Sequence, residues 1–384
     1  MDFNFTEEQT MFQQAAADFC KNEVESVAMK LENSKEFPAE LTQRMSELGF
    51  MGLVVPEQYG GVGADYLAYL LVEGEIAKTS ISLSMTLGAQ NSLVGLPMIN
   101  FASEELKQRY LPSLASGEKL GCFALTEPGA GSDPAGMRTT AVKKGDKWVL
   151  NGTKIYITNG AVAKLAIVWA RTGTKPDGKP QITAFLVDKD ESPFKVGTVE
   201  DKMGVHASPT TELIFEDCEV PAGNVLGKEG DGFKVALLTL NTGRLSVATQ
   251  CLGLAQAAYE RAKKFATERE QFGQKLADFQ AIAFKLADMI TEINAAKGLV
   301  WHAVWLKEQH GLNDPRFISM AAQAKLYASE MAERVTSASV QIHGGYGYMK
   351  EYRVEEFFRA ARLMTIVEGT SEIQRLTISR WELK

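Results

Sequence analysis

The sequence predicts an α+β protein in which helical regions stand at both ends of the chain and a β region lies between them. The chain has 384 residues, which is more than a single hydrophobic core usually serves. The apolar period also changes twice, from helical to strand-like near residue 120 and back again near residue 231. We therefore expect three domains, over residues 1–120, 121–231 and 232–384.

Helical patterning opens the chain. Thr6 and Gln9 have the spacing of a capping box, and Phe12 and Phe19 then recur at helical spacing. Further helical runs are expected at 41–48, 69–77 and 104–114, with a turn-rich break at 59–64.

Strand-like runs occupy the middle of the chain. Trp148–Leu150 and Lys154–Thr158 flank Asn151-Gly152, a dipeptide typical of two-residue hairpin turns. Asp177-Gly178 predicts another turn. Further strands are expected at 166–170, 182–187 and 211–215. Short strands joined by regular turns predict a small antiparallel sandwich or barrel.

Long helices return after residue 231. Between Ile282 and Val304 the apolar residues alternate steps of four and three, which predicts one buried stripe of the kind found in helical bundles. Extended over about 33 residues, this helix would be roughly 50 Å long. A second long helix is expected over about 317–342, ending at Gly344-Gly345.

The composition narrows the functional classes. A net charge of −7 argues against nucleic acid as the main partner. There is no apolar run of the length that a membrane span needs. The acidic start resembles neither a signal peptide nor a transit sequence, which favours a cytoplasmic protein. The four cysteines are expected to be reduced, buried thiols, and neither they nor the four histidines have metal-ligand spacing, so no metal is expected.

A candidate catalytic carboxylate stands near the C-terminus. Glu368 directly precedes Gly369 and Thr370, and a glycine there lets the backbone approach a ligand closely. A carboxylate beside such a backbone suits proton abstraction next to a carbonyl, with a nearby N–H polarising the carbonyl oxygen. Taken alone, the segment is more typical of a solvated Glu at a helix C-cap.

Three further segments combine residue types that bind ligands. Amides around Gly129 and Gly131 could hold a pyrophosphate, although neither a third glycine nor a βαβ unit completes a dinucleotide fingerprint. Arg269 could neutralise a phosphate, Phe272 could cover a ring, and residues 341–345 close a helix. Singly, the three segments are more typical of a turn, a surface ion-pair cluster and a glycine C-cap.

Five segments together carry a specific resemblance. They are Ala-Leu-Thr-Glu-Pro-Gly-Ala-Gly-Ser-Asp (124–133), Asn-Gly-Thr-Lys-Ile-Tyr-Ile-Thr-Asn-Gly (151–160), Arg-Glu-Gln-Phe-Gly (269–273), Gln-Ile-His-Gly-Gly-Tyr-Gly (341–347) and Glu-Gly-Thr-Ser-Glu-Ile-Gln-Arg (368–375). In this order, on a plan of helices, strands and helices, the set resembles the acyl-CoA dehydrogenase family over essentially the whole chain.

The resemblance implies a homotetramer that binds FAD, with an N-terminal helical domain, a middle β domain and a C-terminal four-helix bundle in each subunit. The residues implied to contact FAD within one subunit are Phe123, Leu125, Thr126, Gly131, Ser132, Tyr156, Thr158, Thr370 and Glu372. Those implied to hold its diphosphate and adenosine across the subunit boundary are Arg269, Phe272, Gln280, Gln341 and Gly345. An electron-transferring flavoprotein is implied as the acceptor.

The implied reaction is α,β-dehydrogenation of an acyl-CoA thioester, in which Glu368 takes the α-proton and hydride passes from the β-carbon to flavin N5. The family's oxyanion donors are the N–H of the catalytic Glu and a ribityl hydroxyl, and burial would raise the pKa of Glu368. A second family arrangement places the base beside Thr242-Gly243-Arg244. Because Gly243 has no carboxyl group, Glu368 is expected to be the sole base.

The residues implied to meet the substrate are Ser132, Asn241, Arg244, Val367 and Gly369. Val367 stands where the family often has Tyr, which would leave room for a branched or ring-shaped acyl group. The segment 85–94 is expected to line the acyl pocket. Gln90 and Asn91 would make part of that pocket polar, unless their amides only pair with backbone. We expect a short, branched or alicyclic acyl group.

Two alternatives remain open from sequence. An enoyl-CoA reductase that runs the reaction in reverse would use the same residues. A catalytically silent acyl-CoA-binding subunit is the alternative outside the enzymes, and the presence of Glu368 together with the FAD residues argues against it.

Overall fold

The computed structural model describes residues 4–383, so the first three residues of the acidic start lie outside the described part. Seven α-helices form the N-terminal region, and the capping box predicted at Thr6 and Gln9 is confirmed at the start of α1. These helices are α1 Glu7–Phe19, α2 Ala28–Ser34, α3 Ala39–Glu47, α4 Tyr66–Thr79, α5 Ile81–Gly88, α6 Leu96–Phe101 and α7 Glu104–Ala115. A π-helical segment, Ala89–Gly95, joins α5 to α6.

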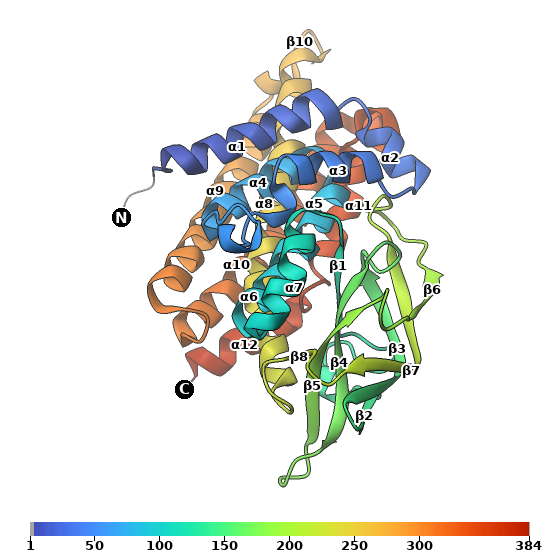
Figure 1. The fold of residues 1–384 in the computed structure, drawn as a ribbon. Coiled ribbons are helices and arrows are strands. Elements are labelled where there is room, and N and C mark those ends of the chain that lie inside the picture. Colours follow the sequence, from blue (N-terminus) through green and yellow to red (C-terminus); the bar gives the residue numbers. More distant parts are fainter. Residues whose placement is uncertain (1–3, 384) are drawn as a thin grey trace.

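The middle of the chain forms one sheet, in the order β6-β7-β3-β2-β4-β5-β8, with β1 added beside β4 (Figure 1). Its strands are β1 Gly121–Ala124, β2 Thr140–Lys144, β3 Lys147–Thr158, β4 Leu165–Thr174, β5 Pro180–Asp188, β6 Lys195–Val199, β7 Thr210–Pro221 and β8 Val225–Leu226. Most pairings are antiparallel, as predicted, but β1 and β2 both pair with β4 in parallel. Separate apolar clusters pack around the sheet, one including Trp169 and the other Phe185.

The hairpin turn predicted at Asn151-Gly152 is wrong. Both residues lie inside β3, and the turn between β2 and β3 instead contains Gly145, at φ +63°. The β3–β7 register shifts between Leu150 and Gly152, and a side chain at Gly152 would collide with Thr139. Glycine is therefore needed here for a bulge and a close approach rather than for a turn.

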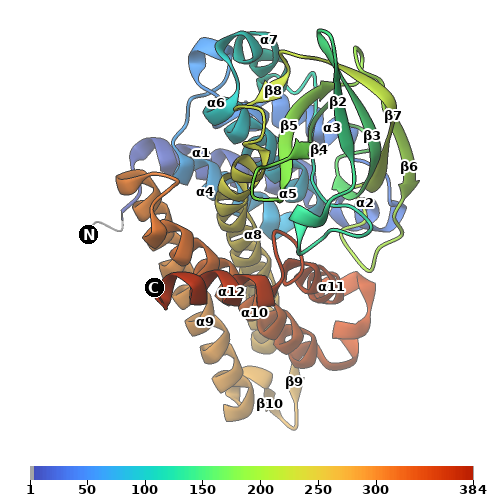
Figure 2. The ribbon, with the colours of Figure 1, turned by 90° about the horizontal axis from the view of Figure 1, so that it is seen from below.

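The C-terminal region is built on three long helices, α8 Gly232–Glu268, α9 Gln280–His310 and α10 Pro315–His343 (Figure 2). The stripe predicted in α9 is confirmed where Met289, Ile293 and Val300 are buried. The shorter helices α11 Val354–Met364 and α12 Ser371–Glu382 both pack on α10. Gly344 ends α10 at φ +58°, in agreement with the predicted stop.

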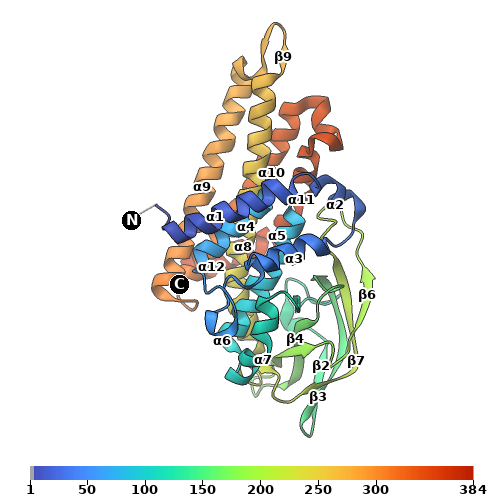
Figure 3. The ribbon, with the colours of Figure 1, turned by 45° about the horizontal axis from the view of Figure 1, so that its top comes forward.

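A short hairpin extends the bundle at one end. Its strands, β9 Glu270–Gln271 and β10 Gln274–Lys275, join α8 to α9 and lie far from the β domain (Figure 3). The opposite part of the bundle joins the N-terminal helices, because one apolar core includes Tyr69 of α4, Leu245 of α8 and Met331 of α10.

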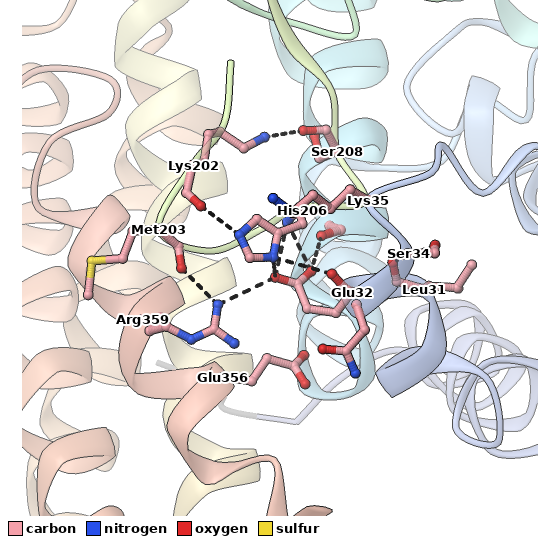
Figure 4. Close-up of polar contacts among 12 residues, drawn as sticks. Leu31, Glu32, Ser34, Lys35, Lys202, Met203, His206, Ser208, Glu356 and Arg359 are labelled. Atoms are coloured by element: carbon pink, nitrogen blue, oxygen red, sulfur yellow. Dashed lines mark hydrogen bonds and ion pairs between the residues drawn. The ribbon is translucent and has the colours of Figure 1, made fainter. Parts of the chain in front are cut away.

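A polar junction ties the three regions together (Figure 4). Glu32 of α2 accepts hydrogen bonds from the backbone N–H of His206, in the loop between β6 and β7, at 3.0 Å to each carboxylate oxygen. Ser82 of α5 donates to the same carboxylate at 3.1 Å. Arg359 of α11 donates to the Met203 carbonyl at 2.8 Å and lies 3.9 Å from Glu32.

Candidate functional site

Glu368 occupies the connection between α11 and α12, with its backbone in the left-handed region at φ +54°. The next residue, Gly369, is also left-handed at φ +94°. Gln374 of α12 donates to the carbonyls of both residues, at 3.0 and 2.8 Å, and Lys325 of α10 donates to the Gly369 carbonyl at 2.9 Å. Glu368 therefore does not cap a helix, as the segment taken alone would suggest, but lies in an unusual turn that α10 and α12 hold in place.

The Glu368 carboxyl group is poised to exchange a proton near neutral pH. Its Oε2 atom is shielded from solvent and has no hydrogen-bond partner among residues 4–383. Burial raises the pKa of Glu368 to about 7, and the positive charges of Arg244 and Lys325 oppose a larger rise. A carboxylate with this pKa can accept a proton at neutral pH.

Helix α8 packs closely against this carboxyl group at Gly243. A Cβ atom built on Gly243 would lie only 2.7 Å from Oε2 of Glu368 and 3.1 Å from Leu93. The residue at 243 therefore faces the carboxyl group directly, and any side chain there would displace it. Glu368 and the alternative base position at Gly243 are thus in direct contact.

Asn241 and Arg244 flank Gly243 on α8. Both are buried, and Arg244 donates to Oδ1 of Asn241 at 2.7 Å. They line a cleft of about 590 Å³ whose other walls include Lys175, after β4, and Trp381 of α12. Arg244 relates this cleft to Glu368, because it lines the cleft and its positive charge acts on the Glu368 carboxylate.

The side-chain amides of Gln90 and Asn91 pair with backbone, which is the second of the two alternatives given for them. The Gln90 amide donates to the carbonyls of Leu114 and Lys119 and accepts from the N–H of Gly121, at 2.7 Å. Asn91 likewise bonds to the backbone of α5 and of the segment at 50–54. Both amides anchor the π-helical segment, so the expectation that they make the acyl pocket polar is wrong. Val367 is half-buried beside Glu368 and packs on the main core.

One group of predicted FAD residues gathers on the β domain. Phe123 lies in β1 next to Trp169, with ring centroids 4.3 Å apart, and Leu125 is buried just after the strand. Thr126 pairs with β3 through its carbonyl, which accepts from Ile155 at 2.9 Å. Tyr156 has a left-handed backbone at φ +57°, and the residue is 63% exposed.

Other members of this group lie at loops and helix ends. Ser132 is exposed and a Cβ on Gly131 would meet open space, so a planar ring could lie against this loop. Thr158 ends β3 opposite Thr210. Thr370 caps α12 and shares a second cleft, of about 460 Å³, with Glu372 and arginine side chains. These open and polar surfaces fit a flavin and its ribityl chain.

Comparison with known proteins identifies the family of this chain. Residues 6–118 match the N-terminal domain of acyl-CoA dehydrogenase, residues 122–218 its middle domain and residues 230–383 its C-terminal domain. The chain belongs to the acyl-CoA dehydrogenase family.

Three relatives illustrate the likeness. An acyl-CoA dehydrogenase of Bacillus subtilis (strain 168) is 48% identical over 98% of this chain and 98% of its own. The caffeyl-CoA reductase-Etf complex subunit CarC of Acetobacterium woodii is 43% identical over 99% of each chain. The structure of butyryl-CoA dehydrogenase from Megasphaera elsdenii has a TM-score of 0.96 and 43% identity, and the match covers 100% of both chains. FAD is the cofactor of the family, so the chain is an FAD-dependent oxidoreductase.

A second group of predicted FAD residues lies on the bundle, and its hairpin members lie far from the β domain (Figure 3). Arg269 and Phe272 belong to the β9–β10 hairpin, where Phe272 is 95% exposed and Arg269 lies over the Tyr346 ring. Gln280 begins α9, and Gln341 and Gly345 lie at the end of α10. Within one subunit, the hairpin residues Arg269 and Phe272 therefore do not reach the group on the β domain (Figure 3).

Two buried residues that hold the Glu368 turn were missed from sequence. Lys325 and Gln374 are both fully buried. Burial lowers the pKa of Lys325 to about 8, while it still donates to the turn. The sequence held one signal for Lys325, which is a lysine on a helix face of small, buried residues such as Ala324 and Ala328.

The described residues 4–383 contain no helix long and apolar enough to cross a membrane. Within the same range, no three His, Cys, Asp or Glu side chains form a group that could hold a metal ion. All four cysteines are buried free thiols, as predicted.

Proposed function

We propose that Glu368 is the base that removes the α-proton of an acyl-CoA thioester in an FAD-dependent α,β-dehydrogenation. The observation that carries this proposal is the Glu368 carboxyl group itself, whose Oε2 atom is shielded from solvent, whose pKa is raised to about 7 and which lies directly against Gly243. A thioester α-C–H is a weak acid, so its carbonyl oxygen must be polarised while the proton leaves. The N–H of Glu368 lies between α11 and α12 and supplies one donor for that oxygen.

The other site residues hold the reactants in place. Arg244 and Asn241 line the cleft through which the thioester would enter, and Gln374 and Lys325 keep the turn at Glu368 from shifting. When bound against the β-domain group, FAD supplies the acceptor for the hydride from the β-carbon. Burial excludes water and so keeps the α-proton transfer to Glu368 productive.

We further propose a short acyl group, branched or alicyclic in preference to long and linear. Val367 leaves more room beside the reacting carbons than a tyrosine would, and a relative with 43% identity is a butyryl-CoA dehydrogenase. Because the amides of Gln90 and Asn91 bond to backbone, they do not favour a polar acyl group. The proposed acyl class therefore depends on Val367 and on the butyryl-CoA dehydrogenase relative.

The test is anaerobic bleaching of the purified flavoprotein near 450 nm by butyryl-, isobutyryl-, cyclohexanecarboxyl- and palmitoyl-CoA. A short or branched thioester should bleach the flavin, and Glu368→Gln, with its FAD retained, should not respond. Equal bleaching by Glu368→Gln would remove Glu368 as the base. Bleaching by palmitoyl-CoA alone would overturn the proposed acyl class.

The reverse reaction is a second candidate, because the relative from Acetobacterium woodii is a reductase subunit. The same residues would serve, with Glu368 returning the proton to the α-carbon. The protein can be supplied with a reduced dye and crotonyl-CoA, and with butyryl-CoA and an oxidised dye. A much larger kcat/KM in the first assay would support the reductase.

We propose that the chain works as a homotetramer and passes electrons to an electron-transferring flavoprotein. The separation of the two FAD groups supports a shared cofactor, because Arg269 and Phe272 can complete only a neighbouring subunit's site. The name of the CarC relative includes an Etf complex, which supports the acceptor. Native mass spectrometry should show a tetramer with FAD for the wild type and loss of FAD for Arg269→Ala. A wild-type protein that is a monomer and keeps its FAD would contradict the shared site.

A further inference from the structure

The polar junction between the three regions contains a histidine that faces acceptors at both ring nitrogens (Figure 4). Nε2 of His206 lies 2.6 Å from the carbonyl oxygen of Lys202, and Nδ1 lies 3.2 Å from the carbonyl oxygen of Glu32. Nδ1 also lies 3.2 Å from Oε1 of the Glu32 carboxylate. Carbonyl and carboxylate oxygens only accept hydrogen bonds, so both ring nitrogens must donate.

Only the imidazolium form of His206 meets this requirement. A neutral imidazole has one N–H and one lone pair, so either neutral tautomer would direct a lone pair at an oxygen of Glu32 or of Lys202. The imidazolium has two N–H groups and a positive charge. Glu32 is buried, and a buried carboxylate needs a cation or donors beside it. His206 and Glu32 therefore form an ion pair that the two carbonyl groups support.

The charged side chains around His206 come from its own loop, from α2 and from α11, while α5 contributes the uncharged Ser82. They are Glu200, Asp201 and Lys202 of the loop, Glu32 and Lys35 of α2, and Glu355, Glu356 and Arg359 of α11.

Two of the cations in this set are matched by other carboxylates. Lys35 pairs with Asp201 at 2.6 Å, and Arg359 donates to both oxygens of Glu355, at 2.6 and 3.1 Å. Among residues 4–383, the cations paired with the Glu32 carboxylate are His206, at 3.2 Å, and Arg359, at 3.9 Å. The charge of Glu32 is therefore balanced first by His206.

The loop that carries His206 supports the end of β3. Thr210, at the start of β7, pairs with Thr158, and the Pro209 carbonyl accepts from the N–H of Asn159 at 3.0 Å. Thr158 is one of the residues implied to contact FAD. A shift of this loop would therefore move a part of the β domain that is proposed to face the flavin.

The other side of the junction leads to the proposed base. Arg359 of α11 donates to the Met203 carbonyl at 2.8 Å, and a Cβ on Gly204 would lie 3.2 Å from the Arg359 side chain. Helix α11 ends at Met364, shortly before Glu368. The junction thus joins the two parts of the protein between which FAD is proposed to lie.

We propose that His206 is a positioning residue that, as an imidazolium, holds the β domain against α2 and α11 and so slows the release of FAD. The proposal rests on the proposed function, because it takes FAD to lie between the β domain and the Glu368 turn. Histidine changes its charge between about pH 5 and 8. Because the folded junction favours the protonated ring, its contribution is lost as pH rises. Deprotonation would remove the ion pair with Glu32 and one ring hydrogen bond together.

The test measures the rate at which the holoenzyme releases FAD between pH 6 and 8, by the fluorescence of free flavin. The rate for the wild type should rise with pH by about tenfold more than the rate for His206→Gln or His206→Arg. Glutamine is uncharged and arginine is charged throughout this range, so neither can change its charge. His302→Gln removes an exposed histidine of α9 as the matched control, and it should keep the wild-type profile.

Lys202 is the neighbouring group whose titration must be separated from that of His206, because burial lowers the pKa of Lys202 to about 8. Lys202→Met should keep the rise in FAD release below about pH 7.5. A rise that disappears in Lys202→Met and persists in His206→Gln would assign the effect to the lysine and overturn the proposal.

A second readout needs no variant. Hydrogen exchange of residues 200–211 in the wild-type holoenzyme, divided by the intrinsic rate at each pH, should increase from pH 6 to pH 8. Constant exchange, or parallel FAD-release profiles in the wild type and His206→Gln, would overturn the role of His206. Neither readout uses turnover, so such a result would leave the proposed dehydrogenation intact. Failure of every thioester to bleach the flavin would instead count against the proposed function.

Discussion

Glu127, in the loop after β1, and Glu368, before α12, are both shielded carboxylates with cations nearby, yet they behave in opposite ways. Glu127 accepts directly from Nζ of Lys154 at 2.7 Å and from the N–H groups of Arg138 and Thr139. Although burial opposes the change, Lys154 and the backbone donors hold its pKa below the usual range. Burial raises the pKa of Glu368 to about 7.

The difference lies in where the neighbouring cations donate. Lys154 donates to Glu127 itself, whereas Lys325 donates to the Gly369 carbonyl and Arg244 to Asn241. Both cations near Glu368 therefore act through space only, and its Oε2 has no partner anywhere in residues 4–383. A carboxylate bonded to its cation anchors a loop, and one whose cations are bonded elsewhere can exchange a proton.

The largest expected effect comes from removing the proton acceptor. Glu368→Gln should slow flavin reduction by a substrate acyl-CoA by about 10²- to 10⁴-fold, because an amide cannot act as a general base. Stopped-flow absorbance near 450 nm measures the rate. Glu127→Gln, assayed at a temperature where it stays folded, should keep a rate within about tenfold of the wild type. A comparable loss in both variants would erase the distinction between the two carboxylates.

For the free energy of unfolding, Glu127→Gln should have a larger effect than Glu368→Gln. Glu127→Gln leaves the fully buried ammonium of Lys154 without its counter-ion, which should cost about 3 kcal/mol of unfolding free energy. Calorimetric Tm values check the direction of this change. The double variant Glu127→Gln/Lys154→Met should recover much of the loss, because no charge is then left buried. A single variant as stable as the wild type would contradict the anchoring role.

The two carboxylates should also give opposite pH dependences. The folded pKa of Glu368, about 7, lies above its ordinary value of 4.5, so its contribution to stability is lost as pH rises through that window. The folded pKa of Glu127 is lowered, so its contribution is lost as pH falls through that pKa. The Tm advantage of Glu368→Gln should therefore grow with pH, while the Tm deficit of Glu127→Gln should shrink in acid.

The smallest expected effect is a shift in the pH profile of catalysis. The rate of flavin reduction should rise with pH through about 7, as Glu368 loses its proton. Lys325→Met removes a positive charge that lowers this pKa, so the profile should move to higher pH. An unchanged profile in a folded variant would mean that Lys325 acts only on the turn. Lys154→Met, whose charge belongs to the Glu127 pair, should leave the profile in place.

Sequence reasoning succeeded where the signal was local. The capping box at Thr6 and the buried stripe of α9 depend on residues within a few turns of each other, and both are confirmed. The glycine at 369 suits its left-handed backbone at φ +94°, while the close approach of a ligand to it stays a prediction. Helical period and glycine placement therefore carried most of the architecture.

The failures have a common physical cause, which is pairing between distant segments. Asn151-Gly152 is typical of a turn, but pairing with β7 holds it inside a strand. The amides of Gln90 and Asn91 bond to backbone that is distant in sequence. The contact of Lys325 with Gly369 joins α10 to a turn 44 residues later. No local pattern encodes these partners.

The left-handed backbone at Glu368 has a consequence for engineering. A non-glycine residue there costs of order 1 kcal/mol, and ionisation of a shielded carboxylate adds to that cost. Glycine would relieve both, so Glu368→Gly should melt above the parent protein while being inactive. A library selected for heat resistance alone would then enrich dead clones at this codon. Directed evolution of this enzyme needs a turnover screen in every round.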